Sequence, residues 1–98
     1  MKRGMTRKSL AEEYYEELDD VAEEKGAEWI LLYDFKGLKP NTKFWTNLKR
    51  LTAFGGESAL IQYSVFHTDK KRVAAAAKKL AEHYGATTEV FKGQRTEL

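Results

Sequence analysis

The chain has 98 residues, a net charge of +2 and no cysteine. This length fits a single domain, and the lack of cysteine excludes disulfides, thiolate catalysis and cysteine-containing zinc sites. No apolar run approaches the ~18 residues of a membrane span, so we expect a soluble, cytoplasmic protein without a membrane partner. We expect the two histidines, His67 and His83, to be ordinary surface or boundary residues rather than metal ligands.

Charge is distributed unevenly along the chain. Residues 1–34 contain 10 acidic and 5 basic side chains, whereas residues 35–98 contain 5 acidic and 12 basic ones, so the two parts carry −5 and +7. The basic part is the one expected to meet a polyanion such as nucleic acid. The alternative for such charge runs is a solvated helix face.

The first predicted element is an acidic helix at residues 10–25. Ser9 and Glu12 have the spacing of a capping box, and Gly26 is placed to end the helix. The outer face of this helix is almost entirely acidic, which suits solvent or a basic surface of the same protein better than it suits nucleic acid. We expect residues 1–27 to form an N-terminal acidic helical extension and residues 28–98 to form the domain itself.

The remaining elements follow in chain order. A buried strand is predicted from Trp29 to Asp34, and an amphipathic helix follows it. Residues 59–68 are expected to bend into two short strands, Asp69 to cap a third helix, and residues 87–91 to form the last strand. The inward stripes of the two helices are Phe44, Trp45, Leu48 and Leu51 in one, and Val73, Ala76, Ala77, Leu80 and Tyr84 in the other.

This order of elements predicts an α+β fold, a ferredoxin-like βαββαβ sheet with its helices on one face. A chain of this size hides only roughly 60 to 65% of its unfolded surface, so an uncovered sheet face is expected to pair with a partner. We therefore predict a homodimer that forms through the sheet and uses the apolar residues Ile61, Val65 and Val90.

Three features of residues 29 to about 91 together resemble the CRISPR-associated protein two family. A hydrophobic strand ends in "YD", a basic amphipathic helix follows, and the next strand region contains "QYSVF". The resemblance implies a small ferredoxin-like homodimer that binds duplex DNA or RNA and joins the CRISPR integrase subunit in spacer acquisition. It also implies a metal-dependent endonuclease or endoribonuclease activity.

Carried over to this sequence, the resemblance implies that Asp34 is the metal-binding and catalytic residue, with Tyr33, Ser64 and Phe66 in support. The chain departs from the family in two respects. Lysines follow the aspartate where family members carry arginines, and lysine lacks the planar fork that grips a phosphate through two bonds. The acidic leader lies outside the family pattern.

One aspartate alone does not make a nuclease site. Magnesium typically takes one or two carboxylates plus water and substrate phosphate, and no second acid is near Asp34 in the sequence. Two copies of Asp34 at a twofold axis would share a Mg²⁺ or Mn²⁺ ion that polarises a phosphate and activates water. The alternative is that Asp34 only caps a solvated turn.

The basic residues lack the spacing of a base-reading motif, so we expect them to contact phosphates rather than bases. We therefore predict a nucleic-acid-binding homodimer of CRISPR adaptation. The alternatives are a toxin-type ribonuclease of the same fold and a non-catalytic ferredoxin-like module whose acidic leader recruits a protein. The predicted nucleic-acid-binding residues are Lys36, Lys39, Lys43, Lys49, Arg50, Lys70, Lys71 and Arg72.

Overall fold

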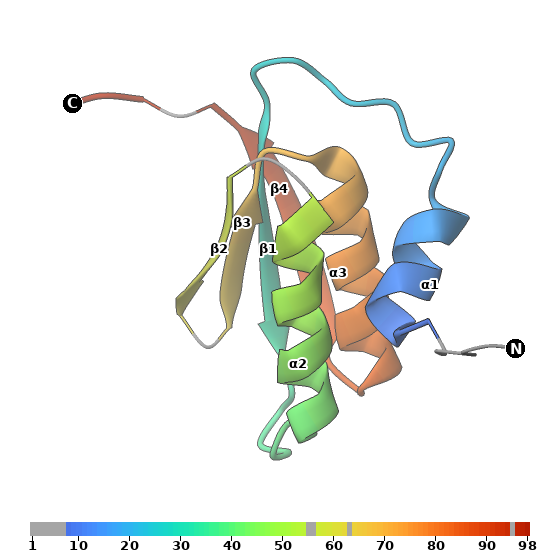
Figure 1. Cartoon of the computed structure of the whole chain (residues 1–98). Helices are drawn as coiled ribbons and strands as arrows, with labels where there is room; N and C mark the ends of the chain where they lie inside the picture. The colour runs from blue at the N-terminus through green and yellow to red at the C-terminus, as the bar shows by residue number, and fades with distance from the viewer. Residues whose placement is uncertain (1–7, 55–56, 63, 95) are drawn as a thin grey trace, which may run out of the picture.

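The computed structural model of the chain describes residues 8–54, 57–62, 64–94 and 96–98, with residues 59–62 described by their backbone alone. Three α-helices, one short 3-10 helix and four strands make up this part of the chain (Figure 1). In chain order they are α1 (Leu10–Glu17), β1 (Glu28–Asp34), α2 (Thr42–Leu51), η1 (Thr52–Phe54), β2 (Ser58–Gln62), β3 (Val65–Thr68), α3 (Lys71–His83) and β4 (Thr87–Gly93).

The strands form one antiparallel sheet in the order β2-β3-β1-β4. The predicted α+β class is confirmed, and residues 58–68 do bend into two strands, β2 and β3. Helices α2 and α3 lie on one side of the sheet, and α1 packs against both of them farther from the strands (Figure 1). In the described part of the chain, no element covers the other face of the sheet.

The core lies between the sheet and the two helices. Burial alternates along β1, where Trp29, Leu31 and Tyr33 point towards the helices and the residues between them do not, as expected for a strand with one covered face. The predicted helix stripes are confirmed as core residues, except that Trp45 and Tyr84 are only partly buried. The fully buried members are Phe44, Leu51, Val73, Ala76, Ala77 and Leu80.

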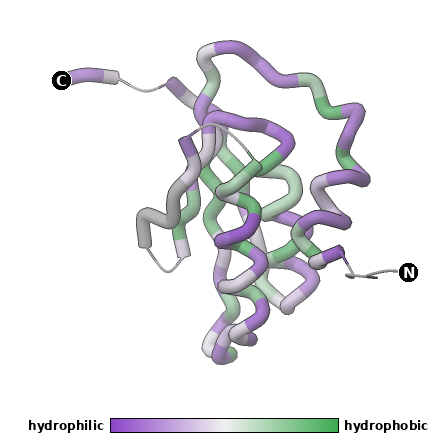
Figure 2. Tube along the Cα trace, in the orientation of Figure 1, coloured by the Kyte–Doolittle hydropathy of each residue, from purple (hydrophilic) through white to green (hydrophobic). Residues whose placement is uncertain are grey.

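Helix α1 is shorter than the sequence predicted. The capping box of Ser9 and Glu12 is present, but the helix ends at Glu17 rather than near residue 25. Carboxylates at 16, 17, 19 and 20 crowd its C-terminal end, where the helix dipole disfavours negative charge. Residues 18–27, which we call the strap, instead run from α1 to the start of β1 in a wide, largely hydrophilic arc (Figures 1 and 2).

The expected cap of α3 was wrong. Asp69 does not cap this helix, because its carboxylate accepts the backbone N–H of Glu57 at 3.0 Å. Lys70, which occupies the N-cap position just before the helix, provides no side-chain cap either. The cap comes from the strap, where the Glu23 carboxylate accepts the N–H groups of Lys71 at 2.6 Å and Arg72 at 3.1 Å. A distant carboxylate therefore satisfies two of the amides that every helix start leaves unpaired.

Candidate functional site

Asp34 is exposed at the end of β1, where its carboxylate closes a turn. Its Oδ1 accepts the backbone N–H of Lys36 at 2.8 Å. Lys36 and Gly37 both have positive φ angles, 54° and 81°, so the chain reverses sharply here. This is the turn-capping arrangement that the sequence left as the alternative to a metal ligand. In this arrangement Oδ1 of Asp34 accepts one hydrogen bond, and the carboxylate keeps further lone pairs that other ligands can use.

A second carboxylate lies on the same face of the sheet as Asp34. Asp34 pairs with Thr87, and Leu32 pairs with Glu89, so Glu89 is the diagonal neighbour of Asp34 at roughly 7 to 8 Å between Cα atoms. A hollow of about 290 Å³ lies over these residues. Glu89 is far from Asp34 in the sequence, so the sequence analysis did not identify it as a neighbour. Among the described residues, however, no group of three or more histidine, aspartate or glutamate side chains is arranged to hold a metal ion.

The three predicted supporting residues have structural roles in this chain. Tyr33 is 2% exposed, and its ring packs edge-on against Phe35, Phe44 and Trp45. Burial raises the pKa of its hydroxyl, which has no hydrogen-bond partner among the residues that the structure describes. Phe66 is buried in the core, and the exposed Ser64 accepts the backbone N–H of Tyr33 through its carbonyl oxygen. Tyr33 and Phe66 therefore support the strand ends by packing.

The predicted basic residues divide into two groups. The first group lies on the loop after β1 and on α2, in a segment that has no acid between Asp34 and Glu57. All five of its cations are exposed, and within the described residues none of them forms an ion pair. We call this group the α2 basic surface; it consists of Lys36, Lys39, Lys43, Lys49 and Arg50.

Glu12, an acid of α1 that interacts electrostatically with Arg50, is already engaged by another group. Glu12 has a pKa below its usual value, chiefly because it accepts the backbone N–H and the hydroxyl hydrogen bond of Ser9, with a smaller contribution from the charge of Arg50. Its carboxylate is thus held by the start of α1 rather than by a lysine of α2. The lysines of this surface keep their positive charge available for a partner.

The second group, Lys70, Lys71 and Arg72 at the start of α3, is partly matched by the acidic leader. Lys71 pairs with Glu24 at 3.2 Å, whereas Lys70 has no ion pair among the described residues. Farther along α3, Lys79, which is outside the predicted set, pairs with Glu17 at 3.1 Å. Arg72 stacks its guanidinium 3.8 Å from the centre of the Tyr15 ring and donates from Nε to the Tyr15 carbonyl. These contacts agree with the inference that the acidic face suits a basic surface of the same protein.

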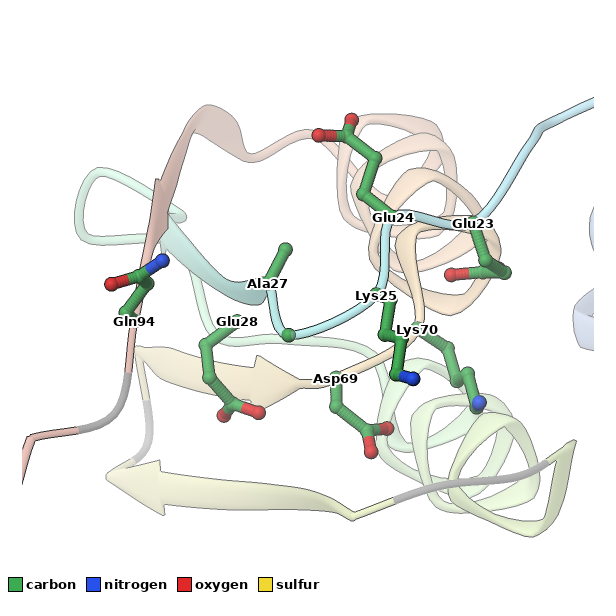
Figure 3. A pocket seen from close by; sticks show the side chains of 9 residues that line it. Glu23, Glu24, Lys25, Ala27, Glu28, Asp69, Lys70 and Gln94 are labelled. Atoms are coloured by element: carbon green, nitrogen blue, oxygen red, sulfur yellow. The ribbon is translucent and has the colours of Figure 1, made fainter.

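The strap lies over a polar hollow of about 620 Å³ at the end of the sheet (Figure 3). Figure 3 shows that lining side chains come from the strap, including Glu24 and Lys25, and from the Asp69–Lys70 turn before α3. Lys92 of β4 forms an ion pair with Glu24, which therefore bridges Lys71 and Lys92. Both bonds lower the pKa of Glu24, with the Lys92 bond contributing most.

The uncovered face of the sheet carries an apolar row. Ile30 pairs with Phe91 of β4 and with His67 of β3, and Ile30 and Phe91 are 38% and 52% exposed. Val65 pairs with Leu32 on the same face. Val90 was assigned to the wrong face, because it pairs with the buried Leu31 on the helix side.

The backbone of Ile61 belongs to β2, but its side chain lies outside the described part of the structure. The uncovered face is therefore defined by Ile30, Leu32, Val65 and Phe91, of which only Val65 belongs to the predicted set. The two histidines have ordinary polar contacts. His67 Nδ1 lies 3.6 Å from a Glu28 carboxylate oxygen, and His83 shares a hydrogen bond with the Tyr14 hydroxyl.

Comparison with known proteins assigns neither a family nor a function to this chain. No protein-family model, no curated protein and no solved structure matches the chain. Among the described helices, none combines the length and the apolar character needed to cross a membrane. A function for this chain must therefore be inferred from the charges and contacts described above.

Proposed function

We propose that this chain binds duplex nucleic acid through phosphate contacts at the α2 basic surface. The observation that carries the proposal is the acid-free segment between Asp34 and Glu57, which exposes five cations without internal ion pairs among the described residues. This segment carries +5 within a chain of net charge +2, so the rest of the molecule carries −3. Lysine-rich surfaces of this kind hold phosphates without reading bases.

The biological setting we propose is CRISPR adaptation in the cytoplasm, as a ferredoxin-like homodimer that binds the integrase subunit. The element order β1-α2-β2-β3-α3-β4 and the sheet order β2-β3-β1-β4 support the ferredoxin-like assignment. The strand ending in Tyr33 and Asp34, and the motif "QYSVF", whose last two residues begin β3, support the family resemblance. The apolar row around Ile30 and Phe91 supports dimerisation through the sheet.

A metal-dependent nuclease is the second candidate function, and the position of Glu89 favours it. Asp34 and Glu89 offer two carboxylates on the uncovered face, where a twofold partner would bring a second pair. Together they fit the oxygen ligands that Mg²⁺ or Mn²⁺ prefers, with the ion shared between two copies of Asp34. The toxin-type ribonuclease alternative requires this site, whereas the scaffold role in adaptation requires only the charged dimer.

The experiment compares two triple variants that have the same net charge. Lys39, Lys43 and Lys49 of the α2 basic surface are changed to glutamine in one variant. The control changes Lys8, Lys78 and Lys79 to glutamine, each of which is paired with a carboxylate. Affinity for a 25-base-pair duplex, with the length chosen as about two helical turns, is measured by fluorescence anisotropy between low and moderate salt.

The proposal predicts different salt dependences for the two variants. Loss of three phosphate contacts should reduce the slope of log affinity against log salt by about 2.7, since each contact contributes about 0.9. The ratio of the parent's affinity to the variant's affinity should therefore be roughly 40-fold larger at ~50 mM salt than at ~200 mM salt. The control should keep the slope of the parent. Equal slopes in the two variants, or no binding by the parent, would reject the α2 basic surface as the interface.

A further inference from the structure

The middle of the strap is held to the domain by charged contacts rather than by apolar packing. Its apolar contacts lie at its two ends, where Leu18 packs against the core and Ala27 is buried, and none of residues 19–26 between them is buried. Glu23 contacts the two amides at the start of α3, and Glu24 contacts the ammonium groups of Lys71 and Lys92. Behind these contacts lies the hollow of about 620 Å³. Little apolar surface therefore opposes displacement of the strap.

The groups held by the strap are the donors that a phosphate would use. Lys71 and Lys92 both approach the ring of Trp29, at 5.5 and 5.8 Å from its centre, so their ammonium groups lie near each other on one surface. Lys70 precedes them at the start of the helix. Glu24 and both of its lysine partners are more than a third exposed. Exposed pairs of this kind are weak and are screened by salt.

The two ends of the strap are fixed independently of these charges. At one end, the buried Ala11 of α1 donates its N–H to Asn47 of α2, and the Tyr15 ring stacks on Phe54 at 4.3 Å. At the other end, Ala27 leads directly into the central strand β1. The strap can therefore leave α3 while both of its anchors remain in place, and its tether keeps Glu23 and Glu24 at a high effective concentration for return.

We propose that the strap is an autoinhibitory acidic segment that competes with nucleic acid for Lys71, Lys92 and the start of α3. In the closed state Glu23 and Glu24 occupy these donors, and the chain binds a duplex through the α2 basic surface alone. When the strap is released, Lys71 and Lys92 become a second patch of phosphate contacts. This inference depends on the proposed function for the class of its partner, a duplex nucleic acid.

The strap provides its own matched control. Glu23→Gln with Glu24→Gln removes the two charges that contact α3, while the new side chain at position 23 keeps an amide oxygen as an acceptor for the helix amides. Asp19→Asn with Asp20→Asn removes two charges from the same segment. Both aspartates are exposed, and no ion pair of theirs is present within the described residues. The two variants therefore have equal net charge and differ only in whether the strap is released.

Duplex affinity is measured for both variants by anisotropy from ~50 to ~200 mM salt. Two additional phosphate contacts should make the log–log slope about 1.8 steeper in the Glu23/Glu24 variant than in the Asp19/Asp20 variant. The ratio of their affinities should rise about tenfold as salt falls across this range. Equal slopes and a constant ratio would overturn the proposal. If the double variant fails to fold, Glu24→Gln alone is compared with Asp20→Asn under the same criteria.

The same comparison in a second background separates this proposal from the proposed function. With Lys39, Lys43 and Lys49 changed to glutamine, the α2 basic surface loses three of its five cations and the strap is untouched. A slope difference that persists there supports the strap even if the α2 basic surface proves not to be the interface. A slope difference that is absent in both backgrounds, while the parent binds duplex through the α2 basic surface, overturns the strap proposal and leaves the proposed function standing.

Discussion

Asn47 connects the acidic leader to the domain, and its replacement by alanine should release α1. The side chain is 6% exposed; its Oδ1 accepts the backbone N–H of Ala11 at 3.0 Å, and its Nδ2 donates to the Lys43 carbonyl at 2.9 Å. Ala11 is completely buried, so water cannot replace the lost acceptor. The first turn of α1 would then contain a buried, unpaired N–H group.

The size of the effect follows from that unpaired group. A buried donor left without a partner costs about 1 to 3 kcal/mol, and each kcal/mol shifts the melting temperature of a domain this size by roughly 4 to 8 °C. Asn47→Ala should therefore lower the free energy of unfolding by about 1 to 3 kcal/mol. The matched control is Thr46→Ala, because Thr46 is exposed and its hydroxyl donates to the Thr42 carbonyl within its own helix. It should change stability by less than about 0.5 kcal/mol.

Urea unfolding followed by circular dichroism gives the stability of each variant, and amide hydrogen exchange locates the change. In Asn47→Ala, the amides of α1 should exchange faster than in the parent, whereas those of α3 should keep the protection set by global unfolding. An Asn47→Ala midpoint equal to that of Thr46→Ala would refute the reasoning. Unchanged protection of the α1 amides would also refute it, because the contact with Ala11 would then contribute nothing to docking.

Three further predictions concern the remaining surfaces. Asp34→Asn keeps an amide oxygen for the Lys36 N–H, so its stability in urea should stay within about 0.5 kcal/mol of the parent, while any magnesium-dependent cleavage seen in a gel assay should disappear. Glu24 has a lowered pKa because of its bonds to Lys92 and Lys71, so its stabilising contribution is present above its usual value of 4.5 and is lost as the pH falls through the lowered value. The difference in melting temperature between the parent and Glu24→Gln should accordingly vanish between neutral and strongly acidic pH. Ile30→Glu should convert a dimer to a monomer in light scattering, and a parent that is monomeric at micromolar concentration would contradict dimerisation through the sheet.

The elements that the sequence predicted well are those with a strong local period. Alternating burial along β1 and the apolar stripes of α2 and α3 require only that one face of each element meets a core. The bend between β2 and β3 was also expected, because a ferredoxin-like arrangement requires two strands in the region of residues 59–68. None of these features depends on which residue, distant in the sequence, lies against the element in the folded chain.

The missed features all depend on distant neighbours. Glu23 caps α3 although it lies 48 positions before Lys71 in the sequence. No local pattern could therefore have identified it as the cap in place of Asp69. The face occupied by Val90 depends on its pairing with Leu31, and a shift of one residue would have exchanged it with Phe91. The approach of Glu89 to Asp34 likewise follows only from the register between β1 and β4.

The cations of α3 are partly paired with acids of the leader, whereas those of α2 are not, and packing explains this difference. Helices α2 and α3 are both rich in lysine and arginine, and the sequence alone does not show which of these cations meet the acids of the leader. Because α1 and the strap pass along α3, carboxylates at the end of α1 and in the strap meet the cations and amides of that helix. Helix α2 meets the leader through apolar packing and the uncharged Asn47, and it keeps its cations unpaired within the described residues. A molecule of low net charge thus presents a positive surface on one helix, because its own acids are used on the other.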